Sequence, residues 1–137
     1  MSSGVSPLEM AAAYGALANG GNYIEPTVFT TITTFDGNIL VKSNPQENRV
    51  VSESVAYVIT DMLQAVVTEG TGKNASIGAM PVAGKTGTTN NALDCWFVGY
   101  TPYYVGATYI GDDAGTSIAR RSVVGTSGTA AKLWSNV

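Results

Sequence analysis

The sequence predicts an α+β domain in which an antiparallel sheet carries helices on both of its faces. The 3-4 spacing of helices dominates the first half of the chain, and the alternation of strands dominates from Val82. The turns between these strands are so short that they force antiparallel pairing. Within the strand Asp94–Tyr100, Cys95 and Phe97 point one way and large apolar neighbours the other, so both faces need cover.

The first helix is predicted from Pro7 to about Ala18. Ser6 is its N-cap, Pro7 takes the first helical position, and Glu9 closes a capping box. The run Asn19-Gly20-Gly21 ends it with residues that tolerate a left-handed conformation. Apolar residues occupy both sides of this helix, which predicts that both sides are buried: Met10, Ala13, Tyr14 and Leu17 on one, and Leu8, Ala11, Ala12 and Gly15 on the other.

A peripheral hairpin and a second helix are predicted next. The hairpin pairs Thr27–Thr34 with Ile39–Lys42 around the turn Asp36-Gly37. Ser52 then caps a helix that ends at 69–72. Six residues at 3-4 spacing predict one buried stripe along this helix: Val55, Val58, Ile59, Met62, Leu63 and Val66.

The remaining chain predicts a sheet and a last helix. Three strands are expected at Val82–Thr89, Asp94–Tyr100 and Tyr103–Gly111. A Gly/Ser/Thr-rich connection at 115–128 leads to a helix at Thr129–Asn136. No repeat or linker divides the chain, so residues 1–137 are read as one unit.

Composition excludes several functions. Charged residues make up 12% of the chain, the net charge is -3, and Arg120-Arg121 is its one pair of adjacent basic residues, so a nucleic-acid footprint is absent. No apolar run is long enough for a membrane span, and we expect the chain itself to be soluble and without membrane contact. The chain has one cysteine, Cys95, and no histidine, so its composition predicts no metal site, no cofactor and no Ser-His-Asp triad. The adjacent acids Asp112-Asp113 are interpreted as a solvated turn.

The segment Lys85-Thr86-Gly87-Thr88 carries the chemistry. On an edge strand, free N–H groups can hold a developing oxyanion, and Gly87 lets a substrate approach the backbone. Thr86 and Thr88 offer hydroxyls for a substrate carboxylate, and Lys85 adds positive charge. On the triplet alone, an ordinary edge strand with solvated side chains remains the alternative interpretation.

Two nucleotide-binding patterns fail. A phosphate loop ending at Gly84-Lys85-Thr86 would need a glycine where the chain has Ala79, and strands instead of a helix follow. The G-x-G-x-x-A match at 70–75 follows a helix, whereas a dinucleotide fingerprint follows a strand. A nucleotide-binding function is therefore not favoured.

Ordered motifs now give a family resemblance. The chain resembles the C-terminal part of the transpeptidase domain of penicillin-binding proteins, and looks more like their bifunctional glycosyltransferase-transpeptidase class. The segments that carry the resemblance are Ser6–Ala11, Ala18–Gly21, Gly70–Gly72, Ala83–Asn90 and Asp94–Pro102.

The resemblance implies a fold, a chemistry and a location. This chain would supply three strands of a five-strand family sheet in a serine D,D-transpeptidase domain at the extracytoplasmic face of the bacterial cell membrane. In that family the serine of a Ser-x-x-Lys motif is acylated by D-Ala-D-Ala stem peptides, and β-lactams imitate these peptides. Lys85 would be the lysine of the third motif, Thr86, Gly87 and Thr88 would bind the substrate, and the Thr88 backbone N–H would be an oxyanion donor.

The chain departs from the family in one decisive respect. It has no Ser-x-x-Lys and no Ser-x-Asn, and the nearest imitation is Thr129-Ala130-Ala131-Lys132. Loss of a nucleophile costs a serine hydrolase about 10⁶ in rate, so we expect this chain alone to be inactive until the N-terminal half of the domain is added. A non-catalytic binding or structural module derived from the same fold is the alternative. The bare edge of Tyr103–Gly111 predicts pairing with a second copy.

Overall fold

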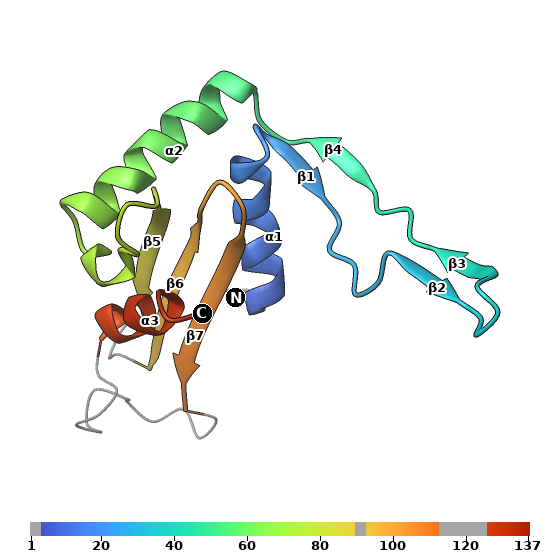
Figure 1. Ribbon diagram of the computed structural model, residues 1–137. Coiled ribbons are helices and arrows are strands. Elements are labelled where there is room, and N and C mark those ends of the chain that lie inside the picture. Colours follow the sequence, from blue (N-terminus) through green and yellow to red (C-terminus); the bar gives the residue numbers. More distant parts are fainter. Residues whose placement is uncertain (1–3, 90–92, 113–125) are drawn as a thin grey trace.

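The computed structural model describes residues 4–89, 93–112 and 126–137, and these form three helices and three small antiparallel sheets (Figure 1). The largest sheet has the order β5-β6-β7, while β1 pairs with β4 and β2 with β3. The elements are α1 (Pro7–Ala18), β1 (Asn22–Ile24), β2 (Thr31–Thr33), β3 (Ile39–Lys42), β4 (Glu47–Arg49), α2 (Glu53–Thr68), the 3₁₀ turn η1 (Lys73–Ala75), β5 (Ala83–Thr88), β6 (Asp94–Tyr100), β7 (Val105–Gly111) and α3 (Ser127–Trp134).

Helices lie on both faces of the β5-β6-β7 sheet, as predicted (Figure 1). On the α3 face, Phe97 is fully buried and meets the Trp134 ring edge-on at 5.3 Å. On the other face, the ring of Tyr14 in α1 packs edge-on against the ring of Tyr100, with ring centroids 6.5 Å apart. The core therefore sits between the sheet, α3 and the end of α2, and its fully or nearly buried members are Val67, Ala75, Val82, Cys95, Phe97, Ala130 and Ala131.

Helix α1 begins and ends where the sequence predicts. The Ser6 backbone N–H and hydroxyl both donate to the Glu9 carboxylate, which lowers the pKa of Glu9. The prediction that both sides of α1 are buried is wrong: Ala16 is its one buried residue and Leu8 is 59% exposed. The reason is that α1 packs against β6 and β7 along one side, and no described element covers its outer side.

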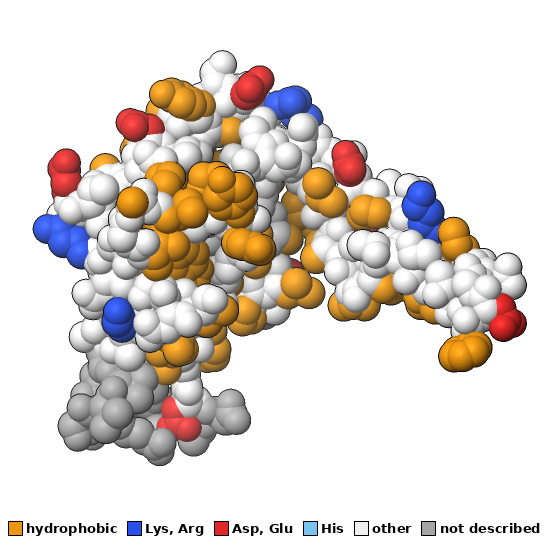
Figure 2. Space-filling view, in the orientation of Figure 1, with side chains coloured by type: hydrophobic (Ala, Val, Ile, Leu, Met, Phe, Trp, Pro, Cys, Tyr) orange, Lys and Arg blue, Asp and Glu red, His pale blue; other side chains and the backbone are white. Residues whose placement is uncertain are grey.

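The β2–β3 hairpin projects from the body as an arm, here defined as residues 27–44 (Figure 1). Its turn is the predicted one, with Gly37 at φ 84°. Strand β2 is shorter than predicted because the Thr27 hydroxyl bonds the backbone of Phe29 and turns the chain there. Hydrophobic side chains lie exposed along the arm to its tip (Figure 2). Phe35, beside the Asp36-Gly37 turn, is fully exposed to solvent.

Helix α2 is capped by Ser52, whose hydroxyl accepts from the Val55 N–H. The predicted buried stripe is wrong for Val55, Val58 and Met62, which are all exposed. Ala56 faces inward instead, and its small side chain lets the helix approach the sheet closely enough for Thr60 to bond the Tyr100 hydroxyl at 2.7 Å.

Candidate functional site

The segment Lys85-Thr86-Gly87-Thr88 lies on β5, at one edge of the main sheet. Among the described residues, β6 is its one strand partner, in the register Lys85↔Val98 and Thr88↔Cys95. The Thr89 N–H donates to the Asp94 carbonyl at 3.1 Å. Backbone groups alternate in an antiparallel ladder, so the N–H and C=O of Thr86 and Thr88 point away from β6, towards the open edge.

Lys85 brings its charge to that same edge. Its side chain is exposed, and its Nζ donates to the Thr86 carbonyl oxygen at 2.9 Å. Since the Thr86 carbonyl points outward, the ammonium group lies at the outer edge of β5 and not over the sheet. The Thr88 N–H, two residues further along, points to the same side. A positive charge and a backbone donor thus share one side of one strand.

Thr86 differs from its neighbours because its side chain is buried, with 8% exposed. Its hydroxyl oxygen lies 2.7 Å from the hydroxyl oxygen of Thr71. Thr71 belongs to the loop after α2, which folds back so that the Gly72 N–H donates to the Val66 carbonyl at 2.9 Å. The sequence predicted a Thr86 hydroxyl open to a ligand, and in this structure that hydroxyl faces the loop.

Gly87 and Thr88 complete the segment. A Cβ atom at Gly87 would lie 3.3 Å from the Cβ of Trp96, so glycine keeps this part of the strand thin. Trp96 packs against Tyr109 with ring centroids 4.7 Å apart, and the Tyr109 hydroxyl donates to Asp94 at 2.7 Å. Thr88 is exposed. The backbone near Gly87 and Thr88 is therefore accessible beside a firmly packed aromatic pair.

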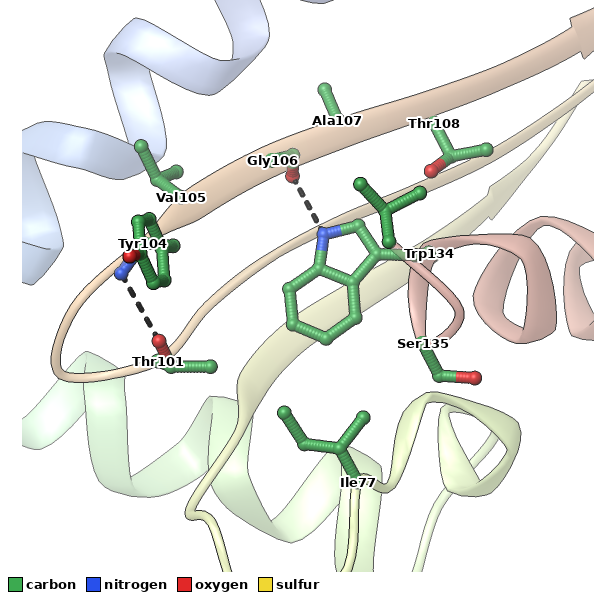
Figure 3. A pocket seen from close by; sticks show the side chains of 10 residues that line it. Ile77, Thr101, Tyr104, Val105, Gly106, Ala107, Thr108, Trp134 and Ser135 are labelled. Atoms are coloured by element: carbon green, nitrogen blue, oxygen red, sulfur yellow. Dashed lines mark hydrogen bonds between the residues drawn. The ribbon is translucent and has the colours of Figure 1, made fainter.

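Sequence reasoning missed a hollow at the opposite edge of the sheet. A cavity of about 450 Å³ lies between β7 and α3 (Figure 3). Trp134 lines it and donates from Nε1 to the Gly106 carbonyl at 3.1 Å. The hollow depends on how α3 packs on β7, for which the sequence has no local signal. Its lining comprises Ile77, Thr101, Tyr104, Val105, Gly106, Ala107, Thr108, Trp134, Ser135 and Val137.

Several sequence predictions fall outside the described residues: the Asn90-Asn91 turn, Asp113, and Arg120-Arg121. Within the described ranges, no cluster of three His, Cys, Asp or Glu side chains could hold a metal ion. In the same ranges, no helix has the length and apolar character that a membrane span requires.

The family model for the penicillin-binding protein transpeptidase domain matches residues 2–124. The chain belongs to this family. Penicillin-binding protein 1A of Clostridium botulinum is 39% identical over 135 residues, which are 98% of this chain and 16% of that protein. Penicillin-binding protein 1A/1B of Bacillus subtilis is 43% identical over 122 residues, 79% of this chain and 13% of that protein. The chain thus spans about a sixth of the length of these relatives.

Solved structures agree. The D,D-transpeptidase domain of a peptidoglycan glycosyltransferase from Eggerthella lenta is 31% identical with a TM-score of 0.78, covering 96% of this chain and 30% of that one. PonA1 of Mycobacterium tuberculosis in complex with penicillin V has a TM-score of 0.80 over 93% of this chain and 35% of that one, and its 24% identity supports the fold alone. The predicted α+β fold and family are confirmed: the chain belongs to an acyl-transferring family of peptidoglycan synthesis.

Proposed function

We propose that this chain is the C-terminal portion of a D,D-transpeptidase domain and supplies the edge that receives a D-Ala-D-Ala stem peptide or a β-lactam. One observation carries the proposal: the Lys85 ammonium and the outward Thr88 N–H lie on one open side of β5. A substrate that lies along this edge meets a positive charge and a backbone donor together. Gly87 between them allows a close approach.

The reaction in the complete domain is acyl transfer through a serine ester. The serine oxygen bonds to the penultimate carbonyl carbon, and the Thr88 N–H is one donor to the oxyanion that forms. The peptide C–N bond then breaks, and D-alanine leaves with a proton on its amine. The amine of a neighbouring stem peptide next attacks the ester, which forms the cross-link and returns the serine hydroxyl. With a β-lactam, the ring amide opens and the acyl group stays on the serine.

The edge residues divide the remaining tasks. Lys85 provides positive potential for the negative charge of the substrate, and Thr88 holds its terminal carboxylate, while the buried Thr86 hydroxyl faces Thr71 and supports the site from within the fold. Each of these interactions fixes the scissile carbonyl relative to the serine, and such positioning is a large part of the rate advantage of an enzyme. This division is consistent with the family to which the chain belongs.

The nucleophile must come from outside these 137 residues, because no serine here has lysine three positions later. We therefore propose that the preceding part of the domain supplies it, at the extracytoplasmic face of the bacterial membrane. The open edge of β7 supports this division. The alternation of the β6–β7 ladder directs the backbone groups of Val105 and Ala107 outward, where further strands of the domain, or a second copy when the chain is alone, can pair.

The test is fluorescent penicillin labelling of the complete domain, meaning this chain joined to the preceding part of the transpeptidase domain of its Clostridium botulinum relative. We expect Lys85→Ala to slow labelling by roughly 10²- to 10³-fold, since electrostatic donors at such sites contribute this much. Lys132→Ala is the matched control, because Lys132 lies on the exposed side of α3, and it should label at the unaltered rate. Equal rates for both variants would remove Lys85 from the site. An unlabelled complete domain would favour a non-catalytic module.

A further inference from the structure

The hydroxyl pair between Thr71 and Thr86 has a preferred direction. The two oxygens lie 2.7 Å apart, and each hydroxyl has one proton to donate. Thr86 is buried, and its hydroxyl has Thr71 as its one side-chain partner among the described residues. If Thr71 donated, the Thr86 proton would be buried without an acceptor, which costs free energy. Thr86 therefore donates to Thr71.

The consequence is that the outward proton belongs to Thr71. Its side chain is exposed, and its oxygen accepts from Thr86, so its own O–H is available to a ligand. The hydroxyl that the sequence motif places on the strand thus acts through the neighbouring loop.

The loop that carries Thr71 is held in place from both sides. Gly70 and Gly72 flank it, and a Cβ at Gly70 would lie 2.9 Å from the Val66 backbone. A Cβ at Gly72 would lie 3.2 Å from Val66 and 3.4 Å from the ring of Phe97. The chain can turn so tightly against the end of α2 because both neighbours are glycine. This turn brings Thr71 within hydrogen-bond distance of β5.

We propose that Thr71 is a substrate-binding residue of the transpeptidase site, whose hydroxyl donates to the terminal carboxylate of a stem peptide or β-lactam while Thr86 orients it. The inference rests on the proposed function and adds a residue outside the strand segment 85–88. It also explains why a buried threonine serves a site that needs a hydroxyl at its surface.

The experiment compares two probes on the complete domain: penicillin V, which has a free carboxylate, and its methyl ester, which has none. The readout is the ratio of the two acylation rates. Thr71→Val should lower this ratio by roughly 10- to 100-fold, the range for a hydrogen bond to a charged group. Thr71→Ser keeps the hydroxyl and should restore the ratio to within about 3-fold of the unaltered domain. A partial loss of folded protein lowers both rates by the same factor, so the ratio still reports the role of Thr71 in the fraction that folds.

Thr68→Val is the matched control, since the Thr68 hydroxyl donates to the Gln64 carbonyl of its own helix. It should change neither rate. A ratio that Thr71→Val leaves unchanged would overturn the role of Thr71 while the proposed function stands. If the unaltered domain reacts with neither probe, the proposed function fails, and the role of Thr71 fails with it.

Discussion

The indole nitrogen of Trp134 donates to the carbonyl oxygen of Gly106 at 3.1 Å and thereby fastens α3 to β7. The same ring meets Phe97 edge-on, with centroids 5.3 Å apart. Gly106 must be small, because a Cβ there would lie 2.9 Å from Nε1. One tryptophan thus joins the last helix to two strands of the sheet.

Trp134→Phe should lower the free energy of unfolding by about 0.5 to 1.5 kcal/mol, since it removes one hydrogen bond and keeps an aromatic ring. Trp134→Ala should lower it by about 3 to 5 kcal/mol, because it also leaves a cavity beside Phe97. Urea unfolding measures both. Tyr103→Phe is the control. Because Tyr103 is exposed, this substitution should change the free energy of unfolding by no more than about 0.5 kcal/mol. Equal losses for the two Trp134 variants would contradict the packing role of the ring.

Gly84→Ala should lower the free energy of unfolding by about 1 to 3 kcal/mol through overpacking. Its Cβ would lie 2.5 Å from Cζ of Phe97 and 2.9 Å from the Val98 carbonyl oxygen. Gly87→Ala, on the same strand, is the matched control because its nearest contact would be 3.3 Å away. The midpoint of thermal unfolding should be lower for Gly84→Ala than for Gly87→Ala, and the reverse order would contradict the tight packing of Gly84 against Phe97.

Alkaline pH should weaken the attachment of α2 to the sheet. Burial raises the pKa of Tyr100, although the hydrogen bond between its hydroxyl and that of Thr60 lowers it in part. Because the pKa of Tyr100 is raised in the folded state, its neutral hydroxyl contributes fully to the free energy of unfolding below the ordinary pKa of tyrosine, about 10. This contribution is lost as pH rises through the folded-state pKa. Urea midpoints between pH 8 and pH 11 should therefore fall less steeply for Tyr100→Phe. Parallel curves would exclude Tyr100 as the titrating group.

The isolated chain should associate through the open edge of β7. Light scattering should show a mass that rises with concentration, because unpaired strand edges recruit strands from other chains. Ala107→Pro should abolish this rise, since the Ala107 N–H points outward and proline cannot donate. Circular dichroism should show the same secondary structure for both. A monomer at every concentration would refute pairing at this edge.

Local signals in the sequence predicted the elements well. The capping box at Ser6 and Glu9, the Asp36-Gly37 turn and the Ser52 cap each act within a few residues, and the structure confirms them. Alternation along Asp94–Tyr100 predicted a sheet covered on both faces. Burial of the helices was predicted less well, because apolar residues such as Val58 and Leu8 stay exposed where no described element packs on them.

The site was predicted as a segment but not as a geometry. The motif Lys85-Thr86-Gly87-Thr88 was found from its residues, and the edge position follows from the strand order. Burial of Thr86 and its bond to Thr71 could not be predicted, since they depend on how the loop after α2 packs against β5. The spacing Gly70-Thr71-Gly72 was noted in the sequence, but glycine spacing alone does not reveal which strand the loop contacts.

The most direct measurement is the intact mass of the protein after incubation with penicillin V, followed by peptide mapping. The complete domain should gain the mass of one penicillin, with the acyl group on a serine that precedes this chain. The isolated chain should gain none, because it lacks a Ser-x-x-Lys nucleophile while keeping the receiving edge at Lys85 and Thr88. A penicillin adduct on any residue of the isolated chain would contradict the account.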